Sequence, residues 1–477
     1  MMSRVLTVVL LAIVAPVHAT IVKGTGILKA LGRRPIANVQ IVDSVHTCGP
    51  RARTLSNVGV LDREQGQVEE AREALAEELR LCRELAEINP ETYRSELAET
   101  LNKVGLFDSN YGQVKEALKE YAEALQIRRE LAEKNPDKYR SDVAETLNNL
   151  GVLDRNQGRV EEARKEFGEA LQIYRELAEK NPDSYRPYIA RTLNNLAVLD
   201  ADQGRVEEAR KEYGEALQIY RELAEKNPET YRPYLATSLN NLGVFDRNQG
   251  RVEEARKEYA EALQIRRDLV EKSPETYRPD VAATLNNLGT LDNEQARMEE
   301  AHQELADALQ IYRELAEKNA ESYRPYVAIT LNNLGALDSD QGRMEEARKE
   351  YAEALQIRRE LAEKNPESYR PDLAATLNNL GTLDRDQSRV EEAHHELAEA
   401  LQIYRELAEK NPEGYRPYVA TTLSNLAILD RGQSQVEEAR KEYAETLQIY
   451  EGLAKQNPER FSRDVERVKK LLEKLPK

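Results

Sequence analysis

Apolar and polar positions follow one another with a helical spacing along this chain, and residues 185–230 show the pattern in full. Ile189, Leu193, Leu196 and Leu199 are separated by four, three and three residues, which places them on one face of an α-helix. Gly204 follows this stripe, and a glycine in the left-handed conformation is a common helix end. The segment therefore begins with a first helix that ends at a glycine turn.

A second apolar stripe follows the turn. It opens with residues 205–208, whose two glutamates suit the first turn of a helix dipole. Its apolar members are Ala209, Tyr213, Ala216, Leu217, Tyr220 and Leu223. Asn-Pro pairs such as Asn181-Pro182 are expected to end each second helix, because proline cannot continue one, and Pro187 is expected near the start of the next first helix. The unit is a helix–turn–helix with helices of about 18–20 residues.

The whole unit repeats every 46 residues without insertion or deletion. Its marker, Leu-Asn-Asn-Leu, begins at Leu147, Leu193, Leu239, Leu285, Leu331 and Leu377, with altered copies at Leu55, Leu101 and Leu423. Neither helix can bury its stripe alone, so stacked repeats must share one core. Residues 47–460 are predicted to form nine repeats, and residues 461–477 a C-terminal capping helix.

Two repeating details bear on the junctions between units. The turn glycine is replaced by Ala296, Ser388 and Ser434, where a left-handed backbone costs about 1 kcal/mol, so these turns are expected to be softer or differently shaped. Near the end of the second helix, an Arg precedes an Asp by 14 residues or a Tyr precedes a Tyr by the same interval. Because the turn between repeats lies within this interval, we expect the two residues of each pair to be in direct contact, as ion pairs or aromatic pairs. The pairs are Arg128–Asp142, Arg266–Asp280, Arg358–Asp372, Tyr174–Tyr188, Tyr220–Tyr234, Tyr312–Tyr326, Tyr404–Tyr418, Cys82–Glu96 and Tyr450–Asp464.

Composition narrows the function. Charged residues make up 32% of the 477 residues and the net charge is −17, which argues against a nucleic-acid partner because phosphate binding needs a basic face. Cys48 and Cys82 form neither a disulfide framework nor a metal site. No cofactor motif is present, because Gly24, Gly26 and Gly32 lack the spacing of a dinucleotide fingerprint.

The N-terminus differs from the repeats. Arg4 precedes an apolar run over residues 5–14, and small or apolar residues lead up to Ala19, which predicts a signal peptide over residues 1–19 and hence export to the periplasm or outside the cell. The alternative is a cytoplasmic chain with an apolar extension or a misassigned start. The run is too short for a membrane span, and residues 20–46 are expected to form a poorly ordered leader.

The repeat resembles a known family. Leu150-Gly151 followed by Gly158, Val160, Ala163, Phe167 and Ala170 is similar to the tetratricopeptide repeat (TPR) signature, and residues 193–199 are most similar to the repeats of kinesin light chains and their bacterial relatives. The repeat is longer than the standard unit of about 34 residues, and an Asp replaces a bulky residue late in the first helix. The resemblance implies an all-α fold, a right-handed superhelical α-solenoid whose first helices line a concave groove that binds extended peptides or proteins.

The resemblance also implies that asparagines of the first helix hold the main chain of a peptide. The matching column is Asn149, Asn195, Asn241, Asn287, Asn333 and Asn379, extended by Asn57 and Asn425 and interrupted by Lys103; it is flanked by Asn102, Asn148, Asn194, Asn240, Asn286, Asn332 and Asn378. A side-chain amide both donates and accepts, so it can mimic a strand edge toward a peptide. The alternative is that one Asn of each pair bonds a helix end or the adjacent repeat.

Other recurring residues point away from catalysis. An Asp recurs in every repeat, from Asp62 to Asp430, and is interpreted as structural, bonded to an Arg or to the next repeat. His395-Glu396 begins a sequence like the zinc-protease helix motif, but Glu399 stands where the second His should be, and His394 and His395 point about 100° apart.

Three functions remain as hypotheses. The leading one is a non-enzymatic scaffold that binds a partner protein or peptide through the asparagine columns. The alternative is a structural protein that self-associates or associates with the cell envelope. An enzyme would need a compact site that no part of the repeat supplies.

Overall fold

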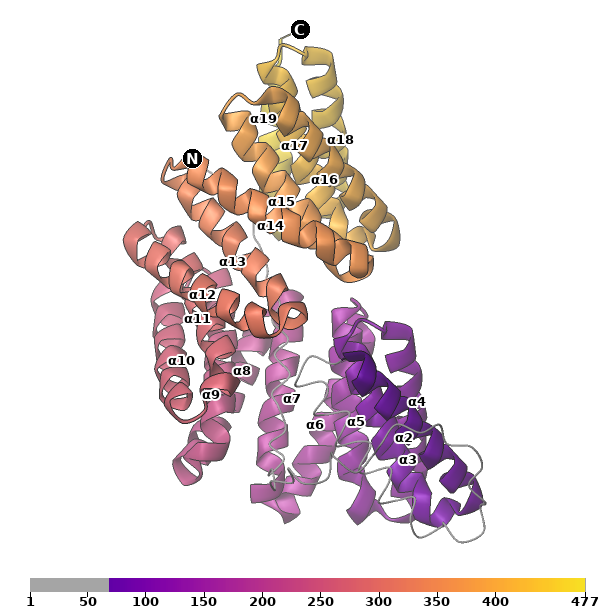
Figure 1. Ribbon diagram of the computed structural model, residues 1–477. Coiled ribbons are helices and arrows are strands. Elements are labelled where there is room, and N and C mark those ends of the chain that lie inside the picture. Colours follow the sequence, from indigo (N-terminus) through magenta and orange to yellow (C-terminus); the bar gives the residue numbers. More distant parts are fainter. Residues whose placement is uncertain (1–67, 477) are drawn as a thin grey trace, which may run out of the picture. The chain divides into compact units, whose positions relative to one another are not determined.

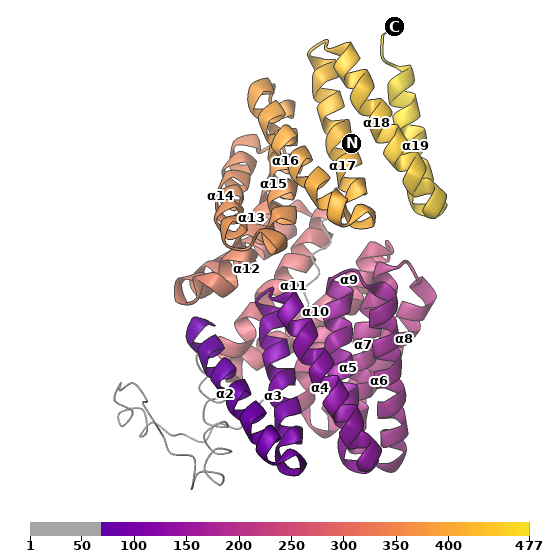
Figure 2. The ribbon, with the colours of Figure 1, turned by 90° about the vertical axis from the view of Figure 1, so that its right-hand side faces the viewer.

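The computed structural model describes residues 68–476. The chain divides into two units, Met1–Arg51 and Ala52–Lys477, and every described residue belongs to the second. The predicted signal peptide, the leader, the first helix of the first repeat and Asn57 lie outside the described residues, so those predictions stay predictions. Within the described part all regular structure is α-helical, in eighteen helices named α2 to α19 (Figures 1 and 2).

The helices come in two alternating sets, each set recurring every 46 residues. The first helices of the repeats are α3 (Pro90–Asn110), α5 (Pro136–Asn156), α7 (Pro182–Asp202), α9 (Pro228–Asn248), α11 (Pro274–Glu294), α13 (Ala320–Asp340), α15 (Pro366–Asp386) and α17 (Pro412–Gly432). The second helices are α2 (Val68–Ile88), α4 (Val114–Lys134), α6 (Val160–Lys180), α8 (Val206–Lys226), α10 (Val252–Lys272), α12 (Met298–Lys318), α14 (Met344–Lys364), α16 (Val390–Lys410) and α18 (Val436–Gln456). The last helix, α19 (Pro458–Glu473), packs on α18.

A single residue separates each second helix from the next first helix. Asn181 lies between α6 and α7, and its side-chain oxygen accepts a hydrogen bond from the backbone N–H of Ser184 at 3.3 Å, as an N-cap does. Pro182 takes the first helical position, where its missing N–H costs nothing. The Asn-Pro pair therefore begins a helix as well as ending one. Because α7 starts at Pro182, Pro187 lies inside it and not near its start, and the helix has 21 residues.

The turn inside each repeat keeps one shape whether or not it contains glycine. Gly204 has φ of 71°, and Ser388 has φ of 60°. In both turns the residue after the left-handed one donates its backbone N–H to the backbone carbonyl of the Asp that recurs in every repeat. These bonds run from Arg205 to Asp200 and from Arg389 to Asp384, each at 2.8 Å. The expectation of a differently shaped turn was wrong, because the flanking helices hold the left-handed conformation in place.

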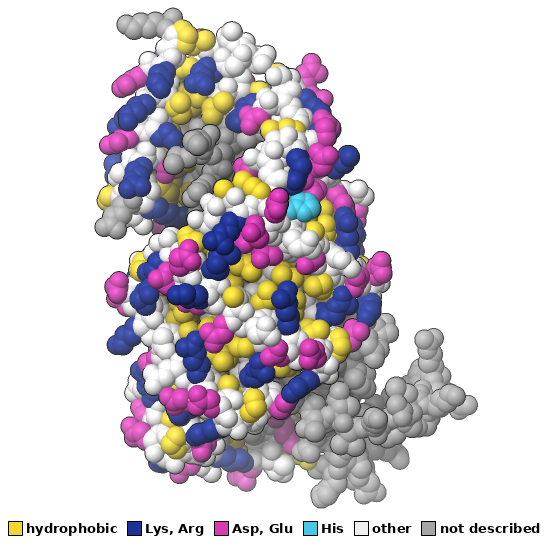
Figure 3. Space-filling model, turned by 90° about the vertical axis from the view of Figure 1, so that its left-hand side faces the viewer, with side chains coloured by type: hydrophobic (Ala, Val, Ile, Leu, Met, Phe, Trp, Pro, Cys, Tyr) yellow, Lys and Arg dark blue, Asp and Glu magenta, His cyan; other side chains and the backbone are white. Residues whose placement is uncertain are grey.

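The two sets of helices are spaced differently. Backbones of consecutive first helices come within contact distance of each other, as α5 and α7 do. Consecutive second helices are joined by longer side chains, as in the ion pair from Arg221 to Glu261, 2.9 Å. The first helices therefore form the more closely spaced, inner side of the array. Acidic and basic side chains are interspersed over the face in Figure 3, with no large area of one sign.

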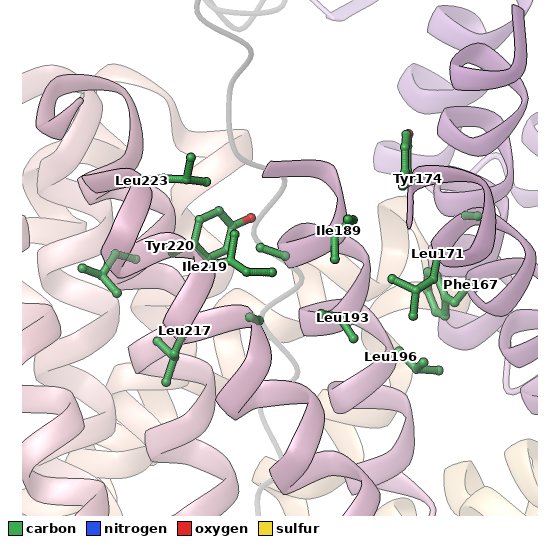
Figure 4. Packing of buried hydrophobic residues seen from close by; sticks show 14 of the residues in the cluster. Phe167, Leu171, Tyr174, Ile189, Leu193, Leu196, Leu217, Ile219, Tyr220 and Leu223 are labelled. Carbon is green, nitrogen blue, oxygen red and sulfur yellow. The ribbon is translucent and has the colours of Figure 1, made fainter. Parts of the chain in front are cut away.

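The apolar core is continuous from repeat to repeat. In Figure 4, side chains of α6, α7 and α8 interdigitate, with Phe167, Leu193 and Tyr220 all buried. The cluster joins α5 through α11, so each apolar stripe is covered by the other helix of its own repeat and by the neighbouring repeats. Gly151 fits against Phe167, since a Cβ there would lie 2.8 Å from the ring.

Four of the nine predicted junction pairs are tyrosine stacks, as predicted. Tyr174 and Tyr188 stack with ring centroids 5.2 Å apart and an interplanar angle of 18°. The equivalent pairs are Tyr220–Tyr234, Tyr312–Tyr326 and Tyr404–Tyr418, at 5.8, 5.3 and 5.3 Å. Offset stacking of this kind stabilises a junction beyond the area it buries.

The arginine junctions make a different contact from the one predicted. Arg266 is 1% exposed, and its Nη1 donates to the backbone carbonyl of Asp280 at 2.9 Å and to the hydroxyl of Thr284. Within the described residues no ion pair joins the two charged groups, so the predicted ion pair was wrong. Burial raises the pKa of Asp280 and Arg266 opposes that rise. Cys82 and Tyr450 likewise contact threonines, Thr100 at 3.4 Å and Thr421 at 3.2 Å.

A tyrosine-stack junction should be able to replace an arginine junction only when both residues of the pair are changed together. We expect Arg266→Tyr or Asp280→Tyr alone to destabilise the fold by about 1–3 kcal/mol, because the first removes the donor that bonds the Asp280 carbonyl and Thr284, and the second removes the negative charge that opposes the desolvation of the buried Arg266. The double variant recreates a tyrosine stack and should recover most of that loss. Denaturant unfolding of the four proteins in a double-mutant cycle measures the coupling. Additive losses would show that the two positions do not form one unit.

The serine turn allows a direct test of backbone strain. Ser388→Gly should raise the free energy of unfolding by about 1 kcal/mol, because glycine adopts positive φ without a Cβ penalty. Gly342→Ser, at φ of 76° and with open space around it, is the converse control and should lower it by a similar amount. Thermal unfolding of both variants checks the sign, and equal midpoints would contradict the strain.

Candidate functional site

The two asparagine columns form one hydrogen-bonded ladder along the first helices. We call the column from Asn102 to Asn378 the first column, and the column that follows it by one residue, from Asn149 to Asn425, the second column. The Nδ2 of an Asn in the second column donates to the Oδ1 of an Asn in the first column of the preceding repeat. Asn195 bonds Asn148 in this way at 3.2 Å. The other bonds are Asn149–Asn102, Asn287–Asn240, Asn333–Asn286, Asn379–Asn332 and Asn425–Asn378, at 3.4, 3.2, 3.1, 3.3 and 3.1 Å.

The ladder has one interruption in its middle. Asn194 has a buried Oδ1 that accepts no hydrogen bond within the described residues, and no ladder bond from Asn241 reaches it. Lys103, which stands in the second column, pairs with Glu99 at 2.7 Å. Bonding to the adjacent repeat, the alternative left open by the sequence, is therefore present in the structure, while ligand contact stays a prediction.

Exposure separates the two columns. Asn148, Asn240 and Asn286 in the first column are buried, as is Asn194. In the second column Asn149, Asn195, Asn241, Asn333 and Asn379 are half-buried, and Asn287 is buried. A second-column amide uses one N–H in the ladder, which leaves its Oδ1 and its other N–H for a further partner. The ladder thus fixes the amide plane of a side chain that still has hydrogen-bonding capacity.

Two polar contacts also join the C-terminal ends of successive first helices in the central repeats. Arg247 lies 3.7 Å from Glu294 of the next repeat, and Asn293 donates to Asp340 of the next repeat at 3.2 Å. Both contacts have the same 47-residue spacing as the asparagine bonds. The polar inner surface is therefore tied together across repeats at two levels.

From Asp154 to Asp384 the recurring Asp is held by one or two arginines, which the structure identifies. Asp246 accepts from Arg210, in the second helix of the preceding repeat, at 3.0 Å, and from Arg251, in its own turn, at 2.8 Å. Asp384 accepts from Arg348 at 2.9 Å in the same way. The partner was missed because the sequence offers several arginines per repeat, although the constant interval of 36 residues was available as a signal.

Neither a cluster of metal-ligating side chains nor a membrane-crossing helix accompanies these features in the described part of the chain. Among residues 68–476 no three His, Cys, Asp or Glu side chains gather closely enough to hold a metal ion. None of the helices in this part of the chain is long and apolar enough to cross a membrane. His394 and His395 lie on α16 with exposed side chains.

Comparison with known proteins identifies the repeats. One tetratricopeptide repeat family model matches residues 96–176, 142–222, 188–268, 234–314 and 326–406, and another matches residues 51–90 and 419–457. A search of curated proteins gave no significant match.

Solved structures with the same kind of helix pairs are similar at low sequence identity. BtubC (BKLC) from P. vanneervenii is 23% identical, with a TM-score of 0.43 over 52% of this chain and 92% of that one. Aspartyl phosphate phosphatase F from Bacillus subtilis is 13% identical, with a TM-score of 0.47 over 77% and 96%. TPR-like repeats of a kinesin light chain type from P. anserina are 17% identical, with a TM-score of 0.35 over 47% and 98%. On the family matches, which cover most of its repeats, this chain belongs to the tetratricopeptide repeat family.

Proposed function

We propose that this protein is a non-enzymatic scaffold that binds an extended segment of a partner protein along the asparagine ladder. Membership of the tetratricopeptide repeat family supports a role in protein–protein interaction. The observation that carries the proposal is the ladder bond, such as that from Asn333 to Asn286. It holds the second-column amides from Asn149 to Asn379, except Asn241, in one orientation before a ligand arrives, which lowers the entropy cost of binding.

The side chains beside the ladder favour a partner segment with few charges. One helical turn before and after the second column stand Thr237, Ile329 and Ala375, and Val198, Val244 and Thr290, all half-buried and uncharged. Residues three or four positions apart share a helix face. A partner would therefore meet amides and small or apolar groups in the central repeats, despite a net charge of −17 for the whole chain.

Such a surface would recognise main chain more than side chain. An amide can accept from a backbone N–H and donate to a backbone carbonyl, so a column of amides suits a chain in an extended conformation. Specificity would then come from the residues flanking the ladder, which differ from repeat to repeat. Arg191 and Glu145, for example, occupy the position held by Thr237.

Binding should depend on the second column in the central repeats. Peptides selected from a phage-displayed random library against the wild-type protein serve as probes. We expect the variant with Asn195→Ala, Asn241→Ala and Asn287→Ala to bind them about ten- to a thousandfold more weakly, since each of the three lost hydrogen bonds is worth about 0.5–1.5 kcal/mol. Isothermal titration well below the unfolding temperature measures the affinity.

A control variant removes inter-repeat polar contacts on the other side of the array. Arg175, Arg221 and Arg313 lie on second helices and pair with Glu215, Glu261 and Glu353. Replacing these three arginines by alanine should leave peptide affinity unchanged. If both triple variants bind like the wild type and unfold normally, the asparagine ladder is a structural device and not the binding surface.

A further inference from the structure

The asparagine ladder has nearly the same chemistry in each repeat, and a uniform ladder cannot fix where along it a bound segment lies. Second-column amides recur every 46 residues, as in Asn287, Asn333 and Asn379. Because amides bind main chain and not particular side chains, a segment shifted by one repeat would make the same hydrogen bonds. A unique position of binding therefore requires a feature that occurs once along the array.

The charge of the neighbouring column does change along the array. We call the residues four positions before the second column the wall column, and its described members are Glu99, Glu145, Arg191, Thr237, Ala283, Ile329, Ala375 and Thr421. Residues four positions apart share a helix face, so the wall column lies beside the second-column amides. Two acidic residues come first, one arginine follows, and the remaining members are uncharged. Among these described members only Arg191 is cationic.

Arg191 has no carboxylate partner within residues 68–476. Its Nε and Nη2 are buried without a hydrogen-bond acceptor, and its guanidinium lies over the ring of Tyr188, with Cζ 5.2 Å from the ring centroid. Nε and Nη2 form an edge of the guanidinium that can hold a carboxylate through two hydrogen bonds. Because the side chain as a whole is half-buried, a change of rotamer turns this unused edge toward the groove.

Glu145 is the acidic neighbour of Arg191 in the preceding repeat. Its side chain is 42% exposed and pairs with Arg128 at 3.2 Å, not with Arg191. One such contact leaves most of the acceptor capacity of a carboxylate unused. Two opposite charges therefore lie on successive first helices, α5 and α7, without bonding each other, and each retains groups for an outside partner.

The gap in the asparagine ladder lies beside Arg191. Asn194 follows it by three residues, which places the two side chains on one helix face. Asn194 is 9% exposed, and its Oδ1 accepts no hydrogen bond from the described part of the chain. Asn241 of α9 makes no ladder bond, so its amide keeps both N–H groups and its Oδ1. The unpaired cation and the gap are independent departures from the repeat, and they occur at the same place.

A buried hydroxyl connects the two wall charges. Tyr174 of α6 is 1% exposed, and its hydroxyl has no hydrogen-bond partner among the described residues. Burial raises the pKa of Tyr174, the charge of Arg191 opposes this rise, and the charge of Glu145 adds to it. The hydroxyl therefore lies within the field of both charges, which places them in one electrostatic neighbourhood.

We propose that Glu145, Arg191 and the ladder gap form an anchor that sets the register of a bound segment, which carries an acidic residue for Arg191 and a basic residue for Glu145. This inference rests on the proposed function, because it assigns a partner chemistry to the same groove. Successive first helices lie about 10 Å apart, and an extended chain rises about 3.3 Å per residue. The two charges of the segment are therefore about three residues apart.

The wall column disfavours every other register. An acidic residue of the segment is repelled at Glu99 and at Glu145, and it meets no cation from Thr237 onward. Lys103, the cation in line with the second column, is already paired with Glu99 at 2.7 Å. The remainder of the segment is uncharged, since it lies along the uncharged wall positions.

Peptides selected from a phage-displayed random library against the wild-type protein test the anchor. We expect them to be enriched in one acidic and one basic residue, about three positions apart and in a constant order. Arg191→Thr takes the residue of the next repeat, Thr237, and should weaken their binding about ten- to a hundredfold, the value of a hydrogen bond to a charged group. Thr421→Ala, a wall position outside the anchor, is the control and should bind like the wild type.

A register shift separates an anchor from a residue that only adds affinity. A selected peptide with a photoreactive benzophenone beside its acidic residue should cross-link the wild type at α7, as mass spectrometry of the digest locates. Arg191→Glu combined with Thr237→Arg recreates the order of charges one repeat later and should move the cross-link to α9. Cross-links spread over several first helices in the wild type, or unmoved in the double variant, would overturn the anchor.

The asparagine triple variant distinguishes failure of this inference from failure of the proposed function. If that variant loses the peptides while Arg191→Thr keeps them, the groove binds without this anchor and the inference is wrong. If the triple variant also keeps the peptides, the groove is not the binding surface and both proposals fail. Thermal unfolding of each variant verifies that the repeats are folded.

Discussion

The structure depends on the packing of each second helix between two first helices, that of its own repeat and that of the next repeat. Neither helix has another apolar neighbour, so this contact sets the position of everything else. Since each repeat relates to the next in the same way, polar contacts recur at fixed intervals of 47 residues for the asparagines, 36 for Arg to Asp and 40 for Arg to Glu of successive second helices. A single insertion would break all three sets at once.

The sequence was sufficient for features that are local or apolar. Spacing alone predicted the helix pairs, the left-handed turns and the tyrosine stacks, because the contact from Tyr174 to Tyr188 spans only one short connection. It was not sufficient for polar partners across a junction. Arg266 could have bonded the Asp280 carboxylate, but the structure directs it to the carbonyl and to Thr284. Pro187 was misplaced because Pro182, five residues earlier, meets the same rule for a helix start.

The asparagine columns show why a recurring polar residue needs two explanations. Asparagine is a poor residue for the middle of a helix, and a bond between neighbouring repeats offsets that cost without any ligand. The bond consumes the first column, whose members are buried, and only part of the second. The half-buried amides therefore retain groups that the fold does not use. A purely structural ladder would need only one hydrogen bond per pair and gives no reason for the second column to remain accessible.

Several local departures from the repeat lie in the C-terminal half. The three strained turns, at Ala296, Ser388 and Ser434, all lie there, and so do His302 and His394, which replace the arginine of the preceding helix. Each departure costs about 1 kcal/mol or less by itself. In an array whose repeats contact only their neighbours, such costs are not shared along the chain. The repeat that contains both Ser434 and Asp430 combines a strained turn with a buried carboxyl group for which no arginine ion pair is found among the described residues, so both departures act on the same turn between α17 and α18.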